Sequence, residues 1–115
     1  LHLNDNGIFV FDINTLGKLR RLTEGPVWSR EFNRDLVIIK VNGGGRGIFE
    51  WDVKIFEHQK RHDYRLYQER IRELAVPHKR ILTALRERFK QSKVIDPGGA
   101  RPSDQSERLY FVCKK

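Results

Sequence analysis

Residues 35–53 read DLVIIKVNGGGRGIFEWDV, and this stretch decides the fold that the sequence predicts. Residues 36–41 and 48–53 are rich in β-branched and aromatic residues, which favour strands. The connecting residues 42–47 contain four glycines, and glycine readily adopts the positive φ angles that hairpin turns require. The stretch therefore predicts a β-hairpin over residues 36–53.

The residues that follow the hairpin carry apolar side chains at spacings of three and four. These side chains are Phe56, Tyr64, Tyr67, Ile71 and Leu74. Such spacing places them on one face of a helix, and it predicts a first helix over about residues 55–75.

Pro77 ends this first helix, because proline lacks a backbone donor and disfavours helical geometry in the preceding residue. Proline is also common in the first turn of a helix. The apolar residues that follow again recur at helical spacing and predict a second helix over about residues 78–93. They are Ile81, Leu82, Leu85 and Phe89.

The ends of the chain complete the predicted fold. Residues 8–13 (IFVFDI) and 109–113 (LYFVC) have the composition of strands, and residues 96–106 form a loop rich in proline, glycine and serine. Residues 15–23 fit no single element, because Gly17 interrupts a helical leucine pattern. We therefore expect an α+β fold, in which two consecutive basic helices pack on one face of a small antiparallel sheet built on the hairpin, with a C-terminal strand.

The bulk composition bounds the class of protein. A chain of 115 residues with seven Phe, three Tyr and two Trp can bury one modest core, so we expect a single domain over residues 1–115. The chain has no Met and starts at Leu1, from which we expect a piece excised or processed from a longer protein. The single cysteine, Cys113, and the lack of a long apolar run favour an intracellular protein, cytoplasmic or nuclear, with no membrane partner.

Positive charge is concentrated in the two predicted helices. Residues 52–93 hold twelve Lys and Arg against six Asp and Glu, which accounts for +6 of the formal net charge of +8. A basic face of this kind attracts the phosphates of DNA or RNA. We therefore expect a non-catalytic nucleic-acid-binding domain whose contacts are Lys60, Arg61, Arg65, Arg72, Lys79, Arg80, Arg86, Lys90 and Lys93.

The hairpin supports a second interpretation, in which the protein is a small nuclease. Asp35 begins one strand, and the sequence Asp52-Val53-Lys54 ends the next. This pattern resembles the PD-(D/E)xK superfamily of restriction-type nucleases. The resemblance implies that Asp35 and Asp52 hold Mg²⁺ while Lys54 steers the attacking water.

Two further alternatives remain open. On the predicted first helix, His58 and His62 are four residues apart, and they could act as acid and base in a metal-free ribonuclease. The basic helices could instead dock an acidic protein partner or other domains of the parent protein. We expect no cofactor unless the nuclease interpretation holds, in which case Mg²⁺ is required.

Overall fold

The computed structural model describes residues 2–115, which form two compact units. The three-stranded unit comprises the chain up to Lys18 together with Ala75–Lys115. The four-stranded unit comprises Leu19–Leu74. Helix α1 (Leu16–Glu24) contains the boundary between them.

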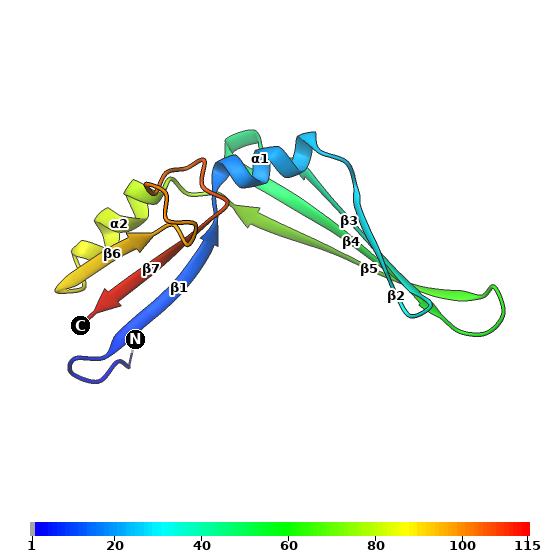
Figure 1. The fold of residues 1–115 in the computed structure, drawn as a ribbon, viewed down its shortest axis with the longest axis horizontal. Coiled ribbons are helices and arrows are strands. Elements are labelled where there is room, and N and C mark those ends of the chain that lie inside the picture. Colours follow the sequence, from blue (N-terminus) through cyan, green and yellow to red (C-terminus); the bar gives the residue numbers. More distant parts are fainter. Residues whose placement is uncertain (1) are drawn as a thin grey trace. The chain divides into compact units, whose positions relative to one another are not determined.

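The three-stranded unit is built on an antiparallel sheet whose strand order is β1-β7-β6. Its strands are β1 (Ile8–Asn14), β6 (Gln91–Ile95) and β7 (Arg108–Lys114), and its helix is α2 (His78–Arg86). Figure 1 shows β7 lying between β1 and β6. The two terminal segments of the chain therefore pair with each other.

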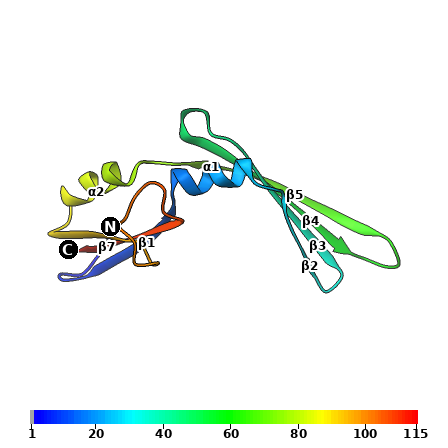
Figure 2. The same cartoon turned by 45° about the horizontal axis from the view of Figure 1, so that its top comes forward.

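Aromatic side chains form the core of the three-stranded unit. Phe11 on β1 stacks on Phe111 of β7 with ring centroids 5.0 Å apart, and Phe9 stacks on Phe89, just after α2, at 6.3 Å. Because side chains alternate along a strand, these rings share one face of the sheet. Helix α2 lies over this sheet in Figure 2. The opposite face leaves Ile8 62% and Val10 54% exposed.

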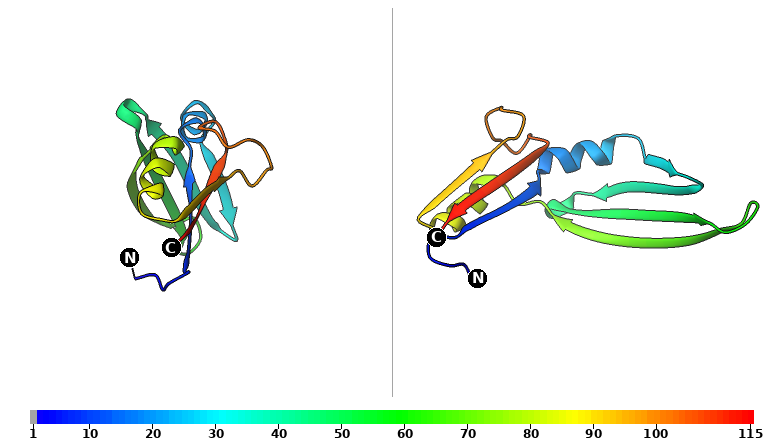
Figure 3. Two further views of the ribbon diagram at one scale, coloured as in Figure 1. Left: turned by 90° about the vertical axis from the view of Figure 1, so that its left-hand side faces the viewer. Right: turned by 60° about the horizontal axis from the view of Figure 1, so that its bottom comes forward.

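The four-stranded unit is an antiparallel meander with the order β2-β3-β4-β5. Its strands are β2 (Trp28–Phe32), β3 (Asp35–Gly43), β4 (Ile48–His58) and β5 (Tyr64–Leu74). A short 3₁₀ turn, η1 (Gly45–Gly47), joins β3 to β4, and the right-hand view of Figure 3 follows the four strands along their length.

The predicted hairpin over residues 36–53 is confirmed by the pairing of β3 with β4. Its turn depends on glycine, because Gly43 and Gly44 have φ angles of 91° and 111°. A Cβ atom on Gly44 would also lie 3.1 Å from the ring of Phe49, which is fully buried. The turn and the core of this unit are therefore packed together.

The predicted fold class is wrong, because residues 2–115 are mostly β, with two sheets and two short helices. Residues 55–75 are not a helix: they contain the end of β4, a turn and all of β5. In the turn, Arg61 has a φ of 53°, and Asp63 donates its backbone N–H to the Lys60 carbonyl at 2.9 Å. The spacing of apolar residues suggested a helix because both faces of β5 mix apolar and charged side chains, which hides the period of two.

The predicted second helix is also too long. Helix α2 ends at Arg86, and residues 91–95 form β6, paired with β7. The predicted strands at 8–13 and 109–113 are confirmed as β1 and β7. Of the ambiguous residues 15–23, residues 16–23 form most of α1, and β2 was not predicted.

We predict that Gly17→Ala destabilises the protein, although alanine is normally better than glycine in a helix by about 1 kcal/mol. A Cβ atom on Gly17 would lie 2.7 Å from the carbonyl oxygen of Asp104 and 2.8 Å from the Cα of Gln105. Relieving this backbone clash should cost roughly 1–3 kcal/mol of unfolding free energy in a urea titration. Gly45→Ala is the control, since no atom lies within 4 Å of its added Cβ. A Gly17→Ala variant as stable as Gly45→Ala would contradict this packing.

Candidate functional site

The residues of the predicted nuclease site do not come together. Asp35 accepts a hydrogen bond from the backbone N–H of His58 at 2.8 Å, so it fixes the end of the hairpin. Asp52 accepts a hydrogen bond from Gln68 at 2.8 Å and shares a face of the sheet with Lys54. Asp35 is on the opposite face from Leu36, and so from Lys54 and Asp52.

The separation of the two carboxylates excludes a shared metal. The residue opposite Asp35 is five residues beyond Asp52 on β4, about 17 Å at roughly 3.3 Å per residue. Within residues 2–115, no group of three or more His, Cys, Asp and Glu side chains could hold a metal ion. The predicted Mg²⁺ site therefore does not form from these residues.

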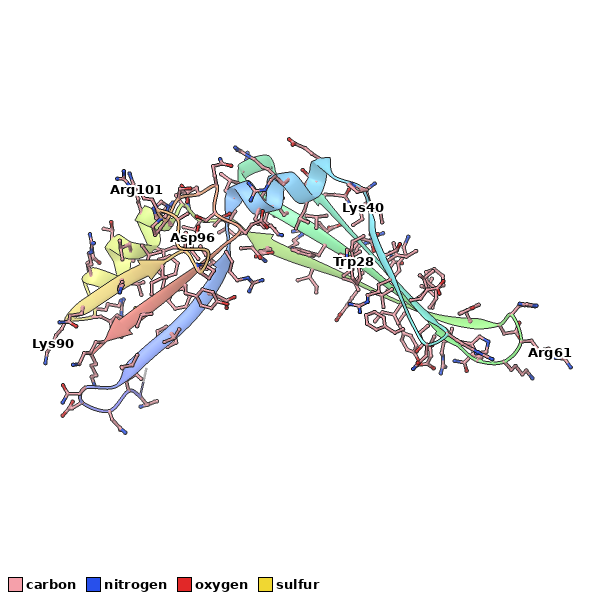
Figure 4. The ribbon with its side chains drawn as sticks, in the orientation of Figure 1. Trp28, Lys40, Arg61, Lys90, Asp96 and Arg101 are labelled. Carbon is pink, nitrogen blue, oxygen red and sulfur yellow. The ribbon has the colours of Figure 1, made fainter. Side chains whose placement is uncertain are left out.

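The basic residues of the predicted nucleic-acid interface do not form one helical face. In the four-stranded unit, Lys60 and Arg61 lie in the β4–β5 turn, and Arg65 and Arg72 lie on opposite faces of β5. In the three-stranded unit, Lys79, Arg80 and Arg86 lie on α2. Lys90 precedes β6, and Lys93 lies on β6. Figure 4 labels Arg61 and Lys90, one in each unit. The charge surplus is thus divided among turns, strands and one short helix.

The two candidate histidines of a metal-free ribonuclease are not helical neighbours. His58 ends β4, its Nε2 lies 2.7 Å from the Arg61 carbonyl oxygen, and its ring meets Tyr64 edge-on at 5.3 Å. His62 lies in the β4–β5 turn. His58 therefore supports the turn. The two histidines do not lie on a helix, so their spacing of four residues does not place them on one face.

The structure instead gathers polar groups around the β6–β7 loop (residues 96–107) of the three-stranded unit. Thr15, which is 1% exposed, donates its hydroxyl to the Ser106 carbonyl and accepts the Lys18 N–H at 3.1 Å. The Thr15 side chain therefore caps the first turn of α1 and ties it to the loop. The Gly17 N–H adds a 2.8 Å bond to the Asp104 carbonyl.

Asp104 caps helix α2 from the same loop. Its Oδ1 accepts the backbone N–H of His78 at 2.8 Å and lies 2.9 Å from the ring Nδ1 of His78. Pro77, the residue before α2, has no side chain that could do this, so the cap comes from a distant part of the sequence. Because a carboxylate only accepts hydrogen bonds, Nδ1 is the protonated nitrogen of His78.

The electrostatics of Asp104 follow from these contacts. Partial burial alone would raise the pKa of the Asp104 carboxyl, but the hydrogen bonds from His78, together with the charges of His78 and Lys79, outweigh it and lower the pKa below 3.8. The Asp104 side chain is 37% exposed, whereas that of His78 is 10% exposed. Asp104 is thus held as a carboxylate beside a nearly buried imidazole.

A cavity of about 720 Å³ opens beside the His78–Asp104 pair. Its lining residues are His78, Lys79, Val94, Arg101, Pro102, Ser103 and Asp104. Figure 4 labels Arg101 and Asp96 in the segment that carries most of this lining. The arrangement combines an oriented imidazole, two cations and a short apolar wall.

Comparison with known proteins places the fold. No protein-family model and no curated protein matches this chain. The chain is similar to the crystal structure of a S-adenosylmethionine-dependent methyltransferase from Clostridium acetobutylicum ATCC 824, with a TM-score of 0.73 and 19% sequence identity. The match covers 98% of this chain and 46% of that chain, so this chain spans just under half of that protein. At this identity the likeness shows a shared fold.

This likeness overturns the predicted function. The nucleic-acid-binding interpretation was inferred from a basic two-helix face, which residues 2–115 do not form. The metal-dependent nuclease was inferred from Asp35, Asp52 and Lys54, which the structure does not bring together, and the fold is shared with a methyltransferase. The expectation of no cofactor, or of Mg²⁺, is likewise contradicted by a neighbour that depends on S-adenosylmethionine. Among residues 2–115, neither helix is long and apolar enough to span a bilayer.

Sequence reasoning missed His78, Asp104, Thr15 and Ser106. Thr15 stands directly before a leucine pattern, so it could have been identified as a helix N-cap. Asp104 caps a helix 26 residues earlier in the chain, and no local pattern reveals such a contact.

We predict that Thr15→Val destabilises the protein by about 2 kcal/mol, because it leaves the Ser106 carbonyl and the Lys18 N–H without their partner. Thr15→Ser keeps the hydroxyl and should cost less than half as much. Urea unfolding of both variants measures the difference. Equal losses would show that the methyl group, and not the hydroxyl, matters at this position.

We predict that Asp104→Asn lowers stability at neutral pH and that the loss fades in acid. A carboxyl whose folded pKa is lowered stabilises the fold above its unfolded pKa, and this contribution disappears as pH falls through the folded pKa. The difference in Tm between wild type and variant should therefore be constant from pH 5 to 7 and shrink below about pH 4. Asp5→Asn, at a fully exposed carboxylate, is the control and should leave Tm nearly unchanged at each pH. A difference in Tm for Asp104→Asn that does not vary with pH would contradict the ionic cap.

Proposed function

We propose that this chain forms part of an S-adenosylmethionine-dependent methyltransferase. The observation that carries the proposal is the shared fold, which extends over 98% of this chain with a TM-score of 0.73. Fold alone does not determine activity, so the proposal also requires that the residues of this chain suit such a role.

The described residues do not by themselves form a nucleoside-binding site for S-adenosylmethionine. Such sites usually lie at the carboxyl ends of parallel strands, beside a glycine-rich turn that leads into a helix. All strand pairs among residues 2–115 are antiparallel, and the glycine-rich segment Gly43–Gly47 joins two strands of a hairpin. The residues present do not fit the cofactor. The cofactor would have to be held by residues equivalent to the part of the methyltransferase structure that this chain does not match.

The three-stranded unit has the features needed to join a larger fold. Strand β1 is an edge strand of its sheet, and one sheet face exposes Ile8, Val10 and Tyr110. Unpaired strand edges and exposed apolar patches mark surfaces that other elements cover. We infer that the rest of a methyltransferase fold packs against β1 and this face.

The four-stranded unit offers a surface for the methyl acceptor. One face of its sheet exposes Trp28 and Tyr67, and a cavity of about 490 Å³ lies there, with Val53, Ile55 and Glu69 among its lining. Small-molecule sites are typically apolar clefts of this size with a few polar groups. This face favours an acceptor with an apolar or aromatic body.

We also propose an intracellular location. Cys113 is a free thiol with no exposure to solvent, which is consistent with a reducing compartment.

The test is calorimetric titration of S-adenosylmethionine into the complete translation product of the gene and, separately, into the 115-residue chain. We predict binding by the complete product, with a dissociation constant on the order of micromolar, and none by the chain alone. S-adenosylhomocysteine should compete, and adenosine triphosphate should not. A complete product that neither binds S-adenosylmethionine nor releases S-adenosylhomocysteine would overturn the proposal.

A substitution on the open face separates assembly from folding. Val10→Asp should weaken S-adenosylmethionine binding by the complete product while leaving the Tm of the 115-residue chain nearly unchanged, because Val10 is solvent-exposed in the chain by itself. Val27→Asp, at a similarly exposed residue that precedes β2, is the matched control and should leave binding intact.

A further inference from the structure

The cavity beside α2 holds two cations that are not neutralised by the protein. Lys79 and Arg101 both line it, and among residues 2–115 neither side chain forms an ion pair or a side-chain hydrogen bond. Lys79 is near enough to Asp104 to help lower its pKa, yet no hydrogen bond joins them. Positive charge is therefore available to a molecule inside the cavity.

His78 adds a nearly buried polar group to the same cavity. Its side chain is 10% exposed, and Asp104 binds its Nδ1. Its Nε2 has no hydrogen-bond partner within residues 2–115 and is not among the fully buried atoms that lack one, so this nitrogen keeps some exposure to solvent. The two hydrogen bonds that Asp104 accepts, from the ring Nδ1–H and from the backbone N–H of His78, fix the orientation of the imidazole.

Asp104 is the one carboxylate in the lining, and it does not cancel this charge. Its Oδ1 already accepts two hydrogen bonds from His78, and Lys79 and Arg101 together carry two positive charges against its one. The remaining wall includes the apolar side chains of Val94 and Pro102. A ligand that fits this lining has an anionic group and a small apolar body.

We propose that this cavity binds the oxyanion group, phosphate or carboxylate, of a small organic molecule. Lys79 and Arg101 supply charge-assisted hydrogen bonds to the oxyanion oxygens, and the planar guanidinium of Arg101 can bind two of them at once. Val94 and Pro102 contact the organic body. The site belongs entirely to the three-stranded unit, so it stands independently of the methyltransferase proposal.

The experiment titrates phenyl phosphate, inorganic phosphate, benzoate and neutral benzyl alcohol into the 115-residue chain at constant ionic strength, with amide chemical shifts followed by NMR. We expect the anions to shift the amide signals of residues 78–79 and 101–104. Tighter binding of phenyl phosphate than of benzoate would identify the ligand group as phosphate, and the reverse order would identify it as carboxylate. Benzyl alcohol binding as tightly as the better anion would overturn the proposal.

The variant pair removes the two cations. Lys79→Gln with Arg101→Gln should weaken binding of the better anion at least about tenfold, as expected for the loss of charge-assisted hydrogen bonds. Lys90→Gln with Lys114→Gln removes the same charge from exposed residues outside the lining, and it should change the affinity less than twofold. Equal losses in the two double variants would overturn the site, because they would show attraction by net charge alone. Arg101→Gln alone is a second test in case the double variant misfolds. Because Arg101 lies on an exposed loop, this single variant should retain the wild-type amide spectrum in the absence of ligand.

Discussion

The pairing of β1 with β7 is the constraint on which the rest of the three-stranded unit depends. It joins Ile8 to Lys114 at one end and Asn14 to Arg108 at the other, and Arg108 adds an ion pair to Asp12. Closing the chain between Asn14 and Arg108 costs about 4 kcal/mol of loop entropy, which the stacked phenylalanines of the core offset. Once closed, this pairing brings the residue after β1, Thr15, beside the residues that precede β7. The caps of both helices follow from that proximity.

The accuracy of the sequence predictions depended on how strongly each segment is buried on one face. The 36–53 hairpin could be predicted because glycine is required in its turn and its strands are rich in β-branched and aromatic residues. Strand β5 could not, since all but one of its residues are exposed and its charged side chains are also good helix formers. Pairing with β4, which local patterns do not encode, decides its conformation.

The candidate site was less predictable than the fold, for a related reason. His58 and His62 were predicted to form an acid–base pair because they are four residues apart in sequence. In the structure His58 ends β4 and His62 lies in the β4–β5 turn, so they are not on one helix. His78 and Asp104 are 26 residues apart in sequence, and they meet because Asp104 lies in the loop that joins β6 to β7. A capping carboxylate supplied by a distant loop gives no local signal, whereas Thr15, which caps the helix directly after it, does.

The number of basic residues in this chain therefore does not reveal where the fold places them. The surplus of Lys and Arg predicted a polyanion-binding face, but the strands divide those residues between two units and opposite faces of a sheet. Only a smaller group of polar side chains, Lys79, Arg101 and the oriented His78, lies around one cavity. Two cations in a partly enclosed site hold a small oxyanion through directed hydrogen bonds, whereas a polyanion needs many cations along an extended surface. The geometry thus favours a small ligand, a conclusion that the net charge of +8 could not have given.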